Sequence, residues 1–133
     1  MKTQSFTLHT EQQGYYDITA AVRKCISDSG IQSGICVVFC PHTTAAITIN
    51  ENADPDVRHD LVVGMDGAFP NRAAFRHGEG NADAHLKCMN VGASEVLIVE
   101  DGKPLLGTWQ GIYFAEFDGP RTRTYFVKVL PDT

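Results

Sequence analysis

The stretch SEVLIVEDGKPLLGTWQGIYFAEFDGPRTRTYFVKVL, residues 94–130, holds two Asp-Gly pairs between segments in which apolar and polar residues alternate. These pairs are Asp101-Gly102 and Asp118-Gly119. Asp-Gly between alternating segments is typical of a two-residue β-hairpin, because both turn positions need positive φ angles. We therefore expect a largely antiparallel sheet here, with strands at 95–99, 105–106, 108–117 and 121–130.

Upstream of this stretch the hydrophobic pattern switches between strand and helix periods. Residues 4–10 alternate, and they are expected to pair with residues 14–16 across a turn. Asp17 as N-cap and Gly30 as left-handed C-cap bound a predicted helix. The remaining predicted elements are strands at 35–40 and 44–50, a helix of about ten residues after Asp54-Pro55, an irregular loop at 65–76 and a short helix after Asn81.

Together these elements predict a fold class of α+β, namely a two-layer, mostly antiparallel β-sheet domain with a few covering helices. A chain of 133 residues with 43% hydrophobic content fits one domain spanning 1–133. The formal charge of -5 opposes nucleic-acid binding, because that needs a basic face. The short apolar runs and a start without a signal-peptide pattern predict no membrane span and a cytoplasmic location.

The four cysteines are expected to be reduced, buried thiols. They stand at positions 25, 36, 40 and 88, and no pair has the two-residue separation typical of zinc knuckles or redox motifs. A small hydrophobe with a weak S–H donor is the usual role of such a residue.

The nonapeptide HGEGNADAH, residues 77–85, concentrates two imidazoles, two carboxylates, an amide and two glycines without a bulky apolar side chain. One interpretation is a solvated loop that merely caps a helix, and we weigh it equally with a functional one. His42 follows a predicted buried strand, with the hydroxyls of Thr43 and Thr44 beside it. Alone it more often fills a packing gap, but three neutral imidazoles suffice as ligands for a divalent metal. The helical spacing places His85 on an inward stripe with Ala82, Leu86 and Met89.

Further polar residues have both a structural and a functional interpretation. Glu79 either orients an imidazole, acts as general base for a metal-bound water, or is simply exposed. Trp109 with Gln110 either packs in the core or lines a pocket for a flat ring. Glu116 and Asp118 are expected to pair with Arg121 and Arg123 in a structural ion-pair network rather than in a phosphate clamp.

Taken together, several segments resemble the YjbQ-type family, whose members are often labelled secondary thiamine-phosphate synthase-like proteins. The matching segments are His42-Thr43-Thr44-Ala45-Ala46 with Asn50-Glu51, Asp54-Pro55 through His59-Asp60, His77 with Gly80-Asn81 and His85-Leu86-Lys87, Gly107-Thr108-Trp109-Gln110, and Glu116 through Arg121.

The resemblance implies an α+β homotrimer with a metal held by His42, His77 and His85, near a pocket lined by Glu51, Asn81, Trp109 and Gln110. It also implies a weak thiamine-phosphate synthase activity, which joins a pyrimidine methyl pyrophosphate to a thiazole phosphate. Imidazole ligands favour zinc, although magnesium would suit pyrophosphate. The expected catalytic residues are Glu51, Glu79 and Asn81, and the expected substrate contacts are Thr43, Thr44, Trp109, Gln110 and Arg121.

Two functional hypotheses follow. The first is a metal-dependent enzyme, a transferase or a hydrolase, acting on a small phosphorylated metabolite. The second is a non-catalytic trimeric module that binds a small ligand or a metal ion at the same cluster.

Overall fold

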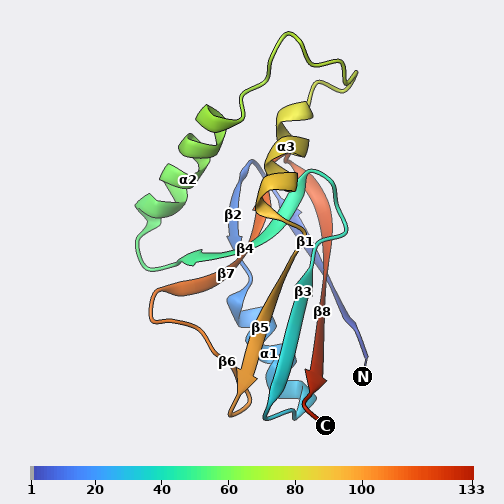
Figure 1. Ribbon diagram of the computed structural model, residues 1–133, viewed down its shortest axis with the longest axis vertical. Helices are drawn as coiled ribbons and strands as arrows, with labels where there is room; N and C mark the ends of the chain where they lie inside the picture. The colour runs from blue at the N-terminus through green and yellow to red at the C-terminus, as the bar shows by residue number, and fades with distance from the viewer. Residues whose placement is uncertain (1) are drawn as a thin grey trace.

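A computed structural model describes residues 2–133 and has an α+β fold, which confirms the expected class. All six strand pairings in that range are antiparallel, and they form two curled sheets (Figure 1). The elements are β1 (Gln4–Thr10), β2 (Gly14–Asp17), α1 (Thr19–Ser29), β3 (Gly34–Phe39), β4 (Ala45–Glu51), α2 (Pro55–Ala68), α3 (Ala82–Val91), β5 (Ser94–Glu100), β6 (Lys103–Pro104), β7 (Gln110–Glu116) and β8 (Arg121–Pro131).

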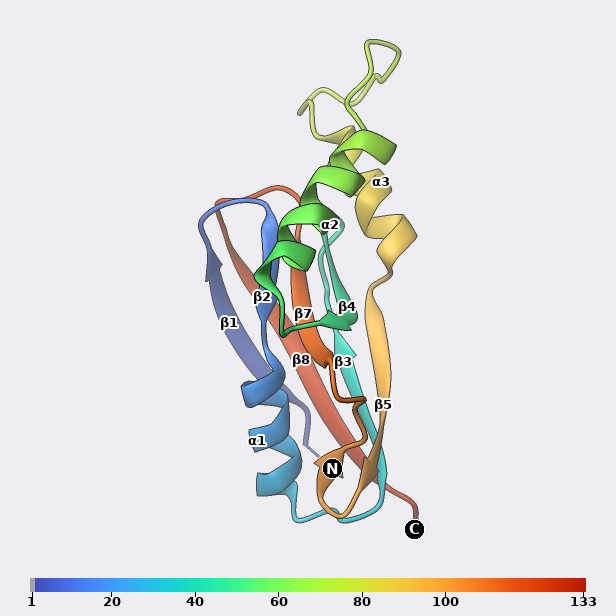
Figure 2. The same cartoon turned by 90° about the vertical axis from the view of Figure 1, so that its left-hand side faces the viewer.

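The large sheet has the strand order β1-β8-β3-β5-β6, and the small sheet has the order β2-β7-β4. The main core lies between them, where residues such as Val38 and Val127 meet Ile47 and Phe114. A second apolar cluster includes Tyr113 and Ala115 of the small sheet together with α2 and α3. Figure 2 shows α2 and α3 projecting together beyond one end of the sheets, with α1 toward the other end. No helix within residues 2–133 is long and apolar enough to cross a membrane.

Only one of the two Asp-Gly turns makes a hairpin. Asp101 and Gly102 have φ angles of 52° and 71°, and they join β5 to β6 as predicted. After Asp118-Gly119, in contrast, the chain passes from the small sheet to the large sheet, so the predicted β7–β8 hairpin is wrong. Pro120 supplies the physical reason: the residue after a two-residue turn must donate its backbone N–H, and proline has none.

The predicted pairing of residues 4–10 with residues 14–16 is also wrong, because β1 pairs with β8 and β2 pairs with β7. The crossings from β1 to β2 and from β7 to β8 lie at the same end of the sheets, since Thr10 is paired with Arg121 and Gly14 with Glu116. The Thr10 hydroxyl ties them together: it donates to Glu116 Oε1 at 2.7 Å and accepts from the Arg121 backbone N–H at 3.1 Å. This end of the sheets lies under the start of α3, where Asn81 contacts Asp118.

The predicted N-cap of α1 is one position off, because Ile18 is the N-cap and Asp17 stands before it. The predicted caps at Gly30 and Asp54 are confirmed. Asp17 Oδ1 accepts the N–H of Thr19 at the start of α1, and Gly30 ends that helix with a φ of 71°. The Asp54 side chain caps α2, with Pro55 as its first residue. However, α2 continues to Ala68, so the first part of the predicted loop at 65–76 is helical.

The predicted inward stripe of α3 is wrong. Met89 is 73% exposed, whereas Ala84 and Lys87 are buried. Lys87 reaches across to α2, where its Nζ lies 2.7 Å from an oxygen of Asp66. His85 is therefore half-buried on the flank of α3 instead of pointing into the core.

Candidate functional site

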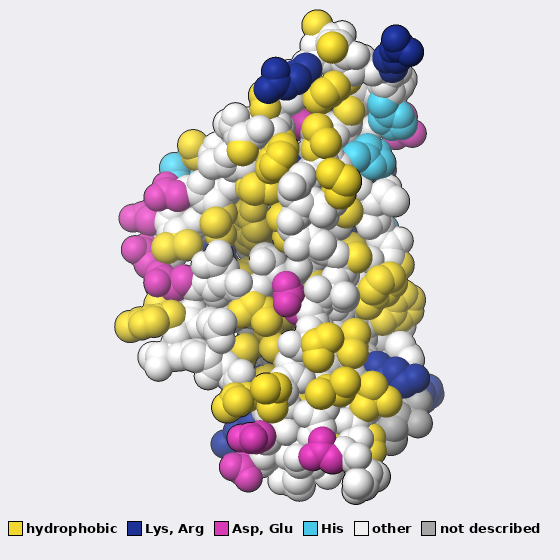
Figure 3. Space-filling view, in the orientation of Figure 1, with side chains coloured by type: hydrophobic (Ala, Val, Ile, Leu, Met, Phe, Trp, Pro, Cys, Tyr) yellow, Lys and Arg dark blue, Asp and Glu magenta, His cyan; other side chains and the backbone are white. Residues whose placement is uncertain are grey.

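A cavity of about 360 Å³ lies between the β3–β4 connection, the loop before α3 and the start of β8. It brings together most of the residues predicted for the site and adds Pro41 and Arg123. Its lining is Pro41, His42, Thr43, Thr44, His77, Glu79, Asn81, His85, Arg121 and Arg123. In Figure 3, histidine side chains gather on the surface near α3 and the loop before it, with basic side chains above them.

His77 and His85 form a close pair in this cavity. Their ring centroids are 5.1 Å apart, and the ring planes are nearly perpendicular at 88°. The loop turns back toward α3 at Gly80, whose φ of 74° favours glycine and whose N–H donates to the His77 carbonyl. Two imidazoles that bind one zinc ion tetrahedrally at about 2.0–2.1 Å have centroids about 5 Å apart, which is close to the separation of these two rings.

His42 shares the cavity but is fastened to β8. Its Nε2 lies 2.9 Å from the Thr124 backbone nitrogen and 3.1 Å from the Thr124 carbonyl oxygen. If Nε2 accepts the N–H, Nδ1 carries the proton and is no ligand; if Nε2–H donates to the carbonyl, Nδ1 is free to bind a metal. Burial, aided by the nearby Arg123 charge, lowers the pKa of His42 and keeps its imidazole neutral.

The three imidazoles do not close into one cluster. Within residues 2–133, no group of three or more His, Cys, Asp or Glu side chains is placed to hold a metal ion. Of the three predicted ligands, the structure brings His77 and His85 together, and His42 joins them only if its ring or the loop that carries His77 shifts.

Beside the histidines, Asp118 connects two predicted site residues. The Asn81 amide nitrogen donates to Asp118 Oδ2 at 2.7 Å, and Arg121 Nη2 donates to the same oxygen at 2.9 Å. Burial alone would raise the pKa of Asp118, but these hydrogen bonds outweigh it and hold the pKa below its ordinary value. Arg121 is half-exposed and faces the cavity with a charge that a bound anion can share.

Glu116 and Arg123 form the predicted structural ion pair under the cavity. Both are nearly inaccessible, and Arg123 Nε donates to Glu116 Oε1 at 2.7 Å. Arg123 Nη2 also donates to the buried Thr44 hydroxyl at 2.9 Å, so that hydroxyl is occupied by the wall of the site. Burial opposes ionisation of Glu116, yet its bonds with Arg123, the Asp118 backbone and Thr10 keep its pKa below the ordinary value.

The sequence profile of the family described as UPF0047 protein YjbQ-like matches residues 4–132 of this chain. The chain belongs to the YjbQ/UPF0047 family. It is 55% identical over 116 residues to UPF0047 protein MJ1081 of Methanocaldococcus jannaschii, a match that covers 87% of this chain and 84% of that protein. It is 52% identical over 122 residues to UPF0047 protein YugU of Bacillus subtilis, covering 91% and 92% of the two chains.

Solved structures show the same YjbQ/UPF0047 fold. A family member from Clostridium acetobutylicum superimposes with a TM-score of 0.93 at 52% identity, covering 96% of this chain and 99% of that one. A YbjQ-like protein of unknown function from Sulfolobus solfataricus gives a TM-score of 0.93 at 34% identity, covering 98% and 97% of the two chains. These likenesses confirm the family that the sequence motifs indicated.

Three residues that the YjbQ resemblance placed near the histidines lie elsewhere within this chain. Glu51 ends β4 and stands opposite Gln110 at the start of β7. The cavity instead lies at the other end of β4, about 20 Å away at the usual strand rise of about 3.3 Å per residue. Trp109 is 62% exposed next to Gln110, so it is not a core aromatic.

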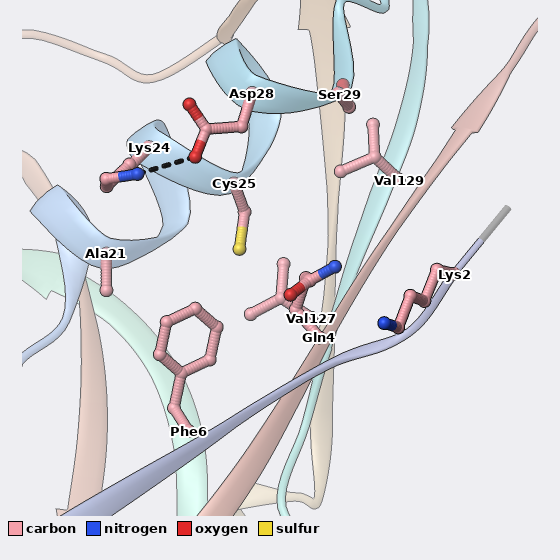
Figure 4. Close-up of a pocket in the computed structure, with 10 residues that line it drawn as sticks. All are labelled: Lys2, Gln4, Phe6, Ala21, Lys24, Cys25, Asp28, Ser29, Val127 and Val129. Carbon is pink, nitrogen blue, oxygen red and sulfur yellow. Dashed lines mark hydrogen bonds and ion pairs between the residues drawn. The ribbon is translucent and has the colours of Figure 1, made fainter.

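A separate cavity of about 410 Å³ lies between α1, β1 and β8 (Figure 4). Phe6 and Cys25 point into it, and Lys24 at its rim pairs with Asp28 at 2.6 Å. It contains no predicted site residue. All four cysteines are free, and burial raises the pKa of Cys36 to about 12 and that of Cys40 to about 11, so these two thiols remain protonated.

The sequence analysis missed the contact between Asn81 and Asp118. Asp118 was noted only as a partner for arginine, and the two residues stand 37 positions apart. No local pattern links residues at such a separation. The single available signal was that Asn81 and Asp118 both adjoin glycine-containing turns of the kind that carry binding residues.

Proposed function

We propose that the histidine-lined cavity is the active site of a metal-dependent enzyme that acts on a small phosphorylated metabolite. The observation that carries the proposal is the pair of rings of His77 and His85, whose 5.1 Å separation suits two ligands of one ion. Arg121 adds a guanidinium on the wall of the same cavity, where it can contact phosphate oxygens.

Each side chain of the cavity has a separate role in this proposal. His77 and His85 would hold the ion, with zinc favoured by their nitrogen ligands. His42 would add Nδ1 if its Nε2–H donates to the Thr124 carbonyl and if its ring or the loop that carries His77 also shifts. The bound ion supplies Lewis-acid stabilisation of charge on a phosphoryl or carbonyl oxygen. Glu79 lines the cavity and acts as the general base that takes a proton from the attacking group, while Arg121 orients the substrate anion.

The reaction class is hydrolysis or group transfer. The thiamine-phosphate synthase reaction provides one substrate pair to assay, because its pyrophosphate leaving group needs the positive charge that Arg121 and a metal ion provide. Glu51, Trp109 and Gln110 take part only if a neighbouring copy of the chain brings them to the cavity, which is consistent with the proposed homotrimer.

The assembly proposal has support from the outer face of the large sheet. Phe39, Val96 and Ile98 are 43%, 59% and 54% exposed there. An apolar face of this kind is typical of a subunit interface. Light scattering should therefore give three times the 14.5 kDa chain mass, and a monomeric mass would contradict the trimer.

The metal assignment is tested by elemental analysis of protein purified without added metal. Wild type is expected to carry a transition metal, and His85→Ala is expected to lose both the metal and turnover in a phosphate-release assay. His59→Ala is the matched control, because that side chain is 73% exposed on α2 and bonds only to its neighbour Asp60. Full metal retention by His85→Ala would refute the proposed ligands.

The second candidate is a non-catalytic trimeric module, whose assembly the same exposed apolar sheet face supports. In that case chelation of the metal should dissociate the trimer, and no compound in a screen of phosphorylated metabolites should be consumed. A trimer that survives chelation, together with turnover of a defined compound, would exclude this module.

A further inference from the structure

Asn81 presents a buried oxygen that lacks a hydrogen-bond donor. Its side-chain orientation follows from chemistry: the Asp118 carboxylate, which is ionised at neutral pH, can only accept, so the amide nitrogen must face it. The Oδ1 atom then points the other way, and it is the one buried side-chain polar atom without a partner in the part of the chain that the structure describes. Such an orphaned acceptor destabilises the fold unless something donates to it.

Helix capping does not satisfy this oxygen. Asn81 stands at the N-cap of α3, where an asparagine oxygen normally accepts a backbone N–H from the first turn. Here the backbone has φ -116° and ψ 29°, and no cap bond from the side chain forms. The amide bonds to Asp118 instead, and Asn81 is one of the residues that line the cavity.

Asn81 lies next to Arg121, the proposed phosphate contact. Asn81 Nδ2 and Arg121 Nη2 contact the same Asp118 oxygen, at 2.7 and 2.9 Å, so the two side chains are neighbours. A ligand whose phosphate contacts Arg121 therefore has only a short span to cover before it reaches Asn81.

We propose that Asn81 Oδ1 accepts a hydrogen bond from a hydroxyl or amino group of the ligand, and that it thereby selects phosphorylated compounds with a donor a few bonds from the phosphate. Asp118 is the positioning residue, since it fixes the Asn81 amide and Arg121 together. This inference rests on the proposed role of Arg121 in phosphate binding, but it requires neither metal nor turnover.

Two isosteric probes test the selection by isothermal titration calorimetry. 2-Hydroxyethyl phosphate has a terminal hydroxyl where propyl phosphate has a methyl group. One hydrogen bond is worth about 1 kcal/mol, so wild type should bind the hydroxyl probe about fivefold more tightly. Asn81→Leu keeps the approximate shape without the acceptor and should bind both probes equally; Asn81→Ala provides the same comparison if the leucine variant does not fold.

The exchange variant Asn81→Asp/Asp118→Asn separates selection from simple structural support. It reverses donor and acceptor across the bond between the two side chains and still presents an acceptor oxygen to the cavity. Both probes should bind it more weakly because Arg121 loses its carboxylate, but the preference for the hydroxyl probe should remain. Asp118→Leu frees the Asn81 amide to rotate and should lose the preference.

Three results would overturn the inference: equal affinity of wild type for the two probes, binding of neither probe, or a preference that persists in Asn81→Leu or Asn81→Ala. Its failure is distinguishable from failure of the proposed enzyme. Absence of metal or of turnover would refute the enzyme, whereas the ratio of the two affinities reports on Asn81 alone.

Discussion

Replacing Arg123 by methionine is expected to destabilise the protein strongly, because Glu116 would be left buried without its cation. Glu116 is fully inaccessible and Arg123 is 4% exposed. Removing one partner of such a pair typically costs about 3–5 kcal/mol, most of which is the cost of the uncompensated charge and not the value of the bond. The variant also frees the Thr44 hydroxyl, which adds a smaller loss.

The double variant Arg123→Met/Glu116→Gln provides the matched control. The glutamine oxygen can still accept the Asp118 N–H, and its amide nitrogen can donate to the Thr10 hydroxyl in place of the bond that this hydroxyl now donates to Glu116, while the charge is removed. If desolvated charge dominates, the double variant should recover about 2 kcal/mol or more of the loss. The free energy of unfolding is measured by urea titration, at one fixed protein concentration because subunit association would contribute to it.

The dependence on pH gives a second signature. In wild type the pKa of Glu116 is held below its ordinary 4.5, so the stability it contributes is present above that value and is lost as pH falls through the lowered pKa. Without Arg123, burial raises the pKa of Glu116, and protonation of Glu116 then removes the unpaired buried charge. The loss of unfolding free energy in Arg123→Met, relative to wild type, should therefore be largest near neutral pH and should become smaller on acidification. This reasoning would be refuted if the loss of unfolding free energy were small, if it did not change with pH, or if it were no smaller in the double variant.

Three further predictions concern other parts of the fold and are checked by the same urea titration. Gly34→Ala places a Cβ 1.9 Å from the Leu130 carbonyl oxygen, so it should cost about 3 kcal/mol or more, whereas Gly30→Ala meets no atom and should cost only about 1 kcal/mol for its positive φ. Lys87→Met should cost less than about 1 kcal/mol, because the two carboxylates that pair with it keep solvent access at 53% and 22% exposure. Asp54→Ala removes the cap of α2 and should cost about 1 kcal/mol. Equal losses of stability in the two glycine variants would contradict the first argument. A loss in Lys87→Met as large as that in Arg123→Met would contradict the second.

Local signals predicted the elements, but not which strands pair. The caps at Asp54 and Gly30 and the turn at Asp101 act through their immediate neighbours, and each occurs where expected. Strand pairing depends on packing between segments that are distant in the sequence. For example, β7 is buried along almost its whole length because α2, α3 and the main core cover its two faces. A strand buried on both faces shows no alternation that reveals its neighbours. Pro120 was the one local feature that argued against the second hairpin.

The same distinction explains which site residues could be predicted. His77 and His85 come from one short segment whose glycines bring the ends together, so composition alone indicated them. Glu51 and Trp109 were grouped with the histidines by resemblance, yet β4 carries Glu51 to the opposite end of the small sheet. Only the strand register shows this separation within one chain.

The departure of Asn81 from the capping rule is itself an argument for function. A sequence that specifies its fold satisfies local preferences almost everywhere, and exceptions gather where activity requires them. At this N-cap the amide gives up its local bond and leaves Oδ1 buried without a donor. If the position served stability alone, Asn81→Ser would restore capping and stabilise the protein without affecting ligand binding. We expect instead that Asn81→Ser loses the preference for 2-hydroxyethyl phosphate, because its shorter side chain cannot reach Asp118. Any gain in the stability of α3 would then come with a loss of ligand affinity. Thermal unfolding and calorimetry on the same sample would measure both changes.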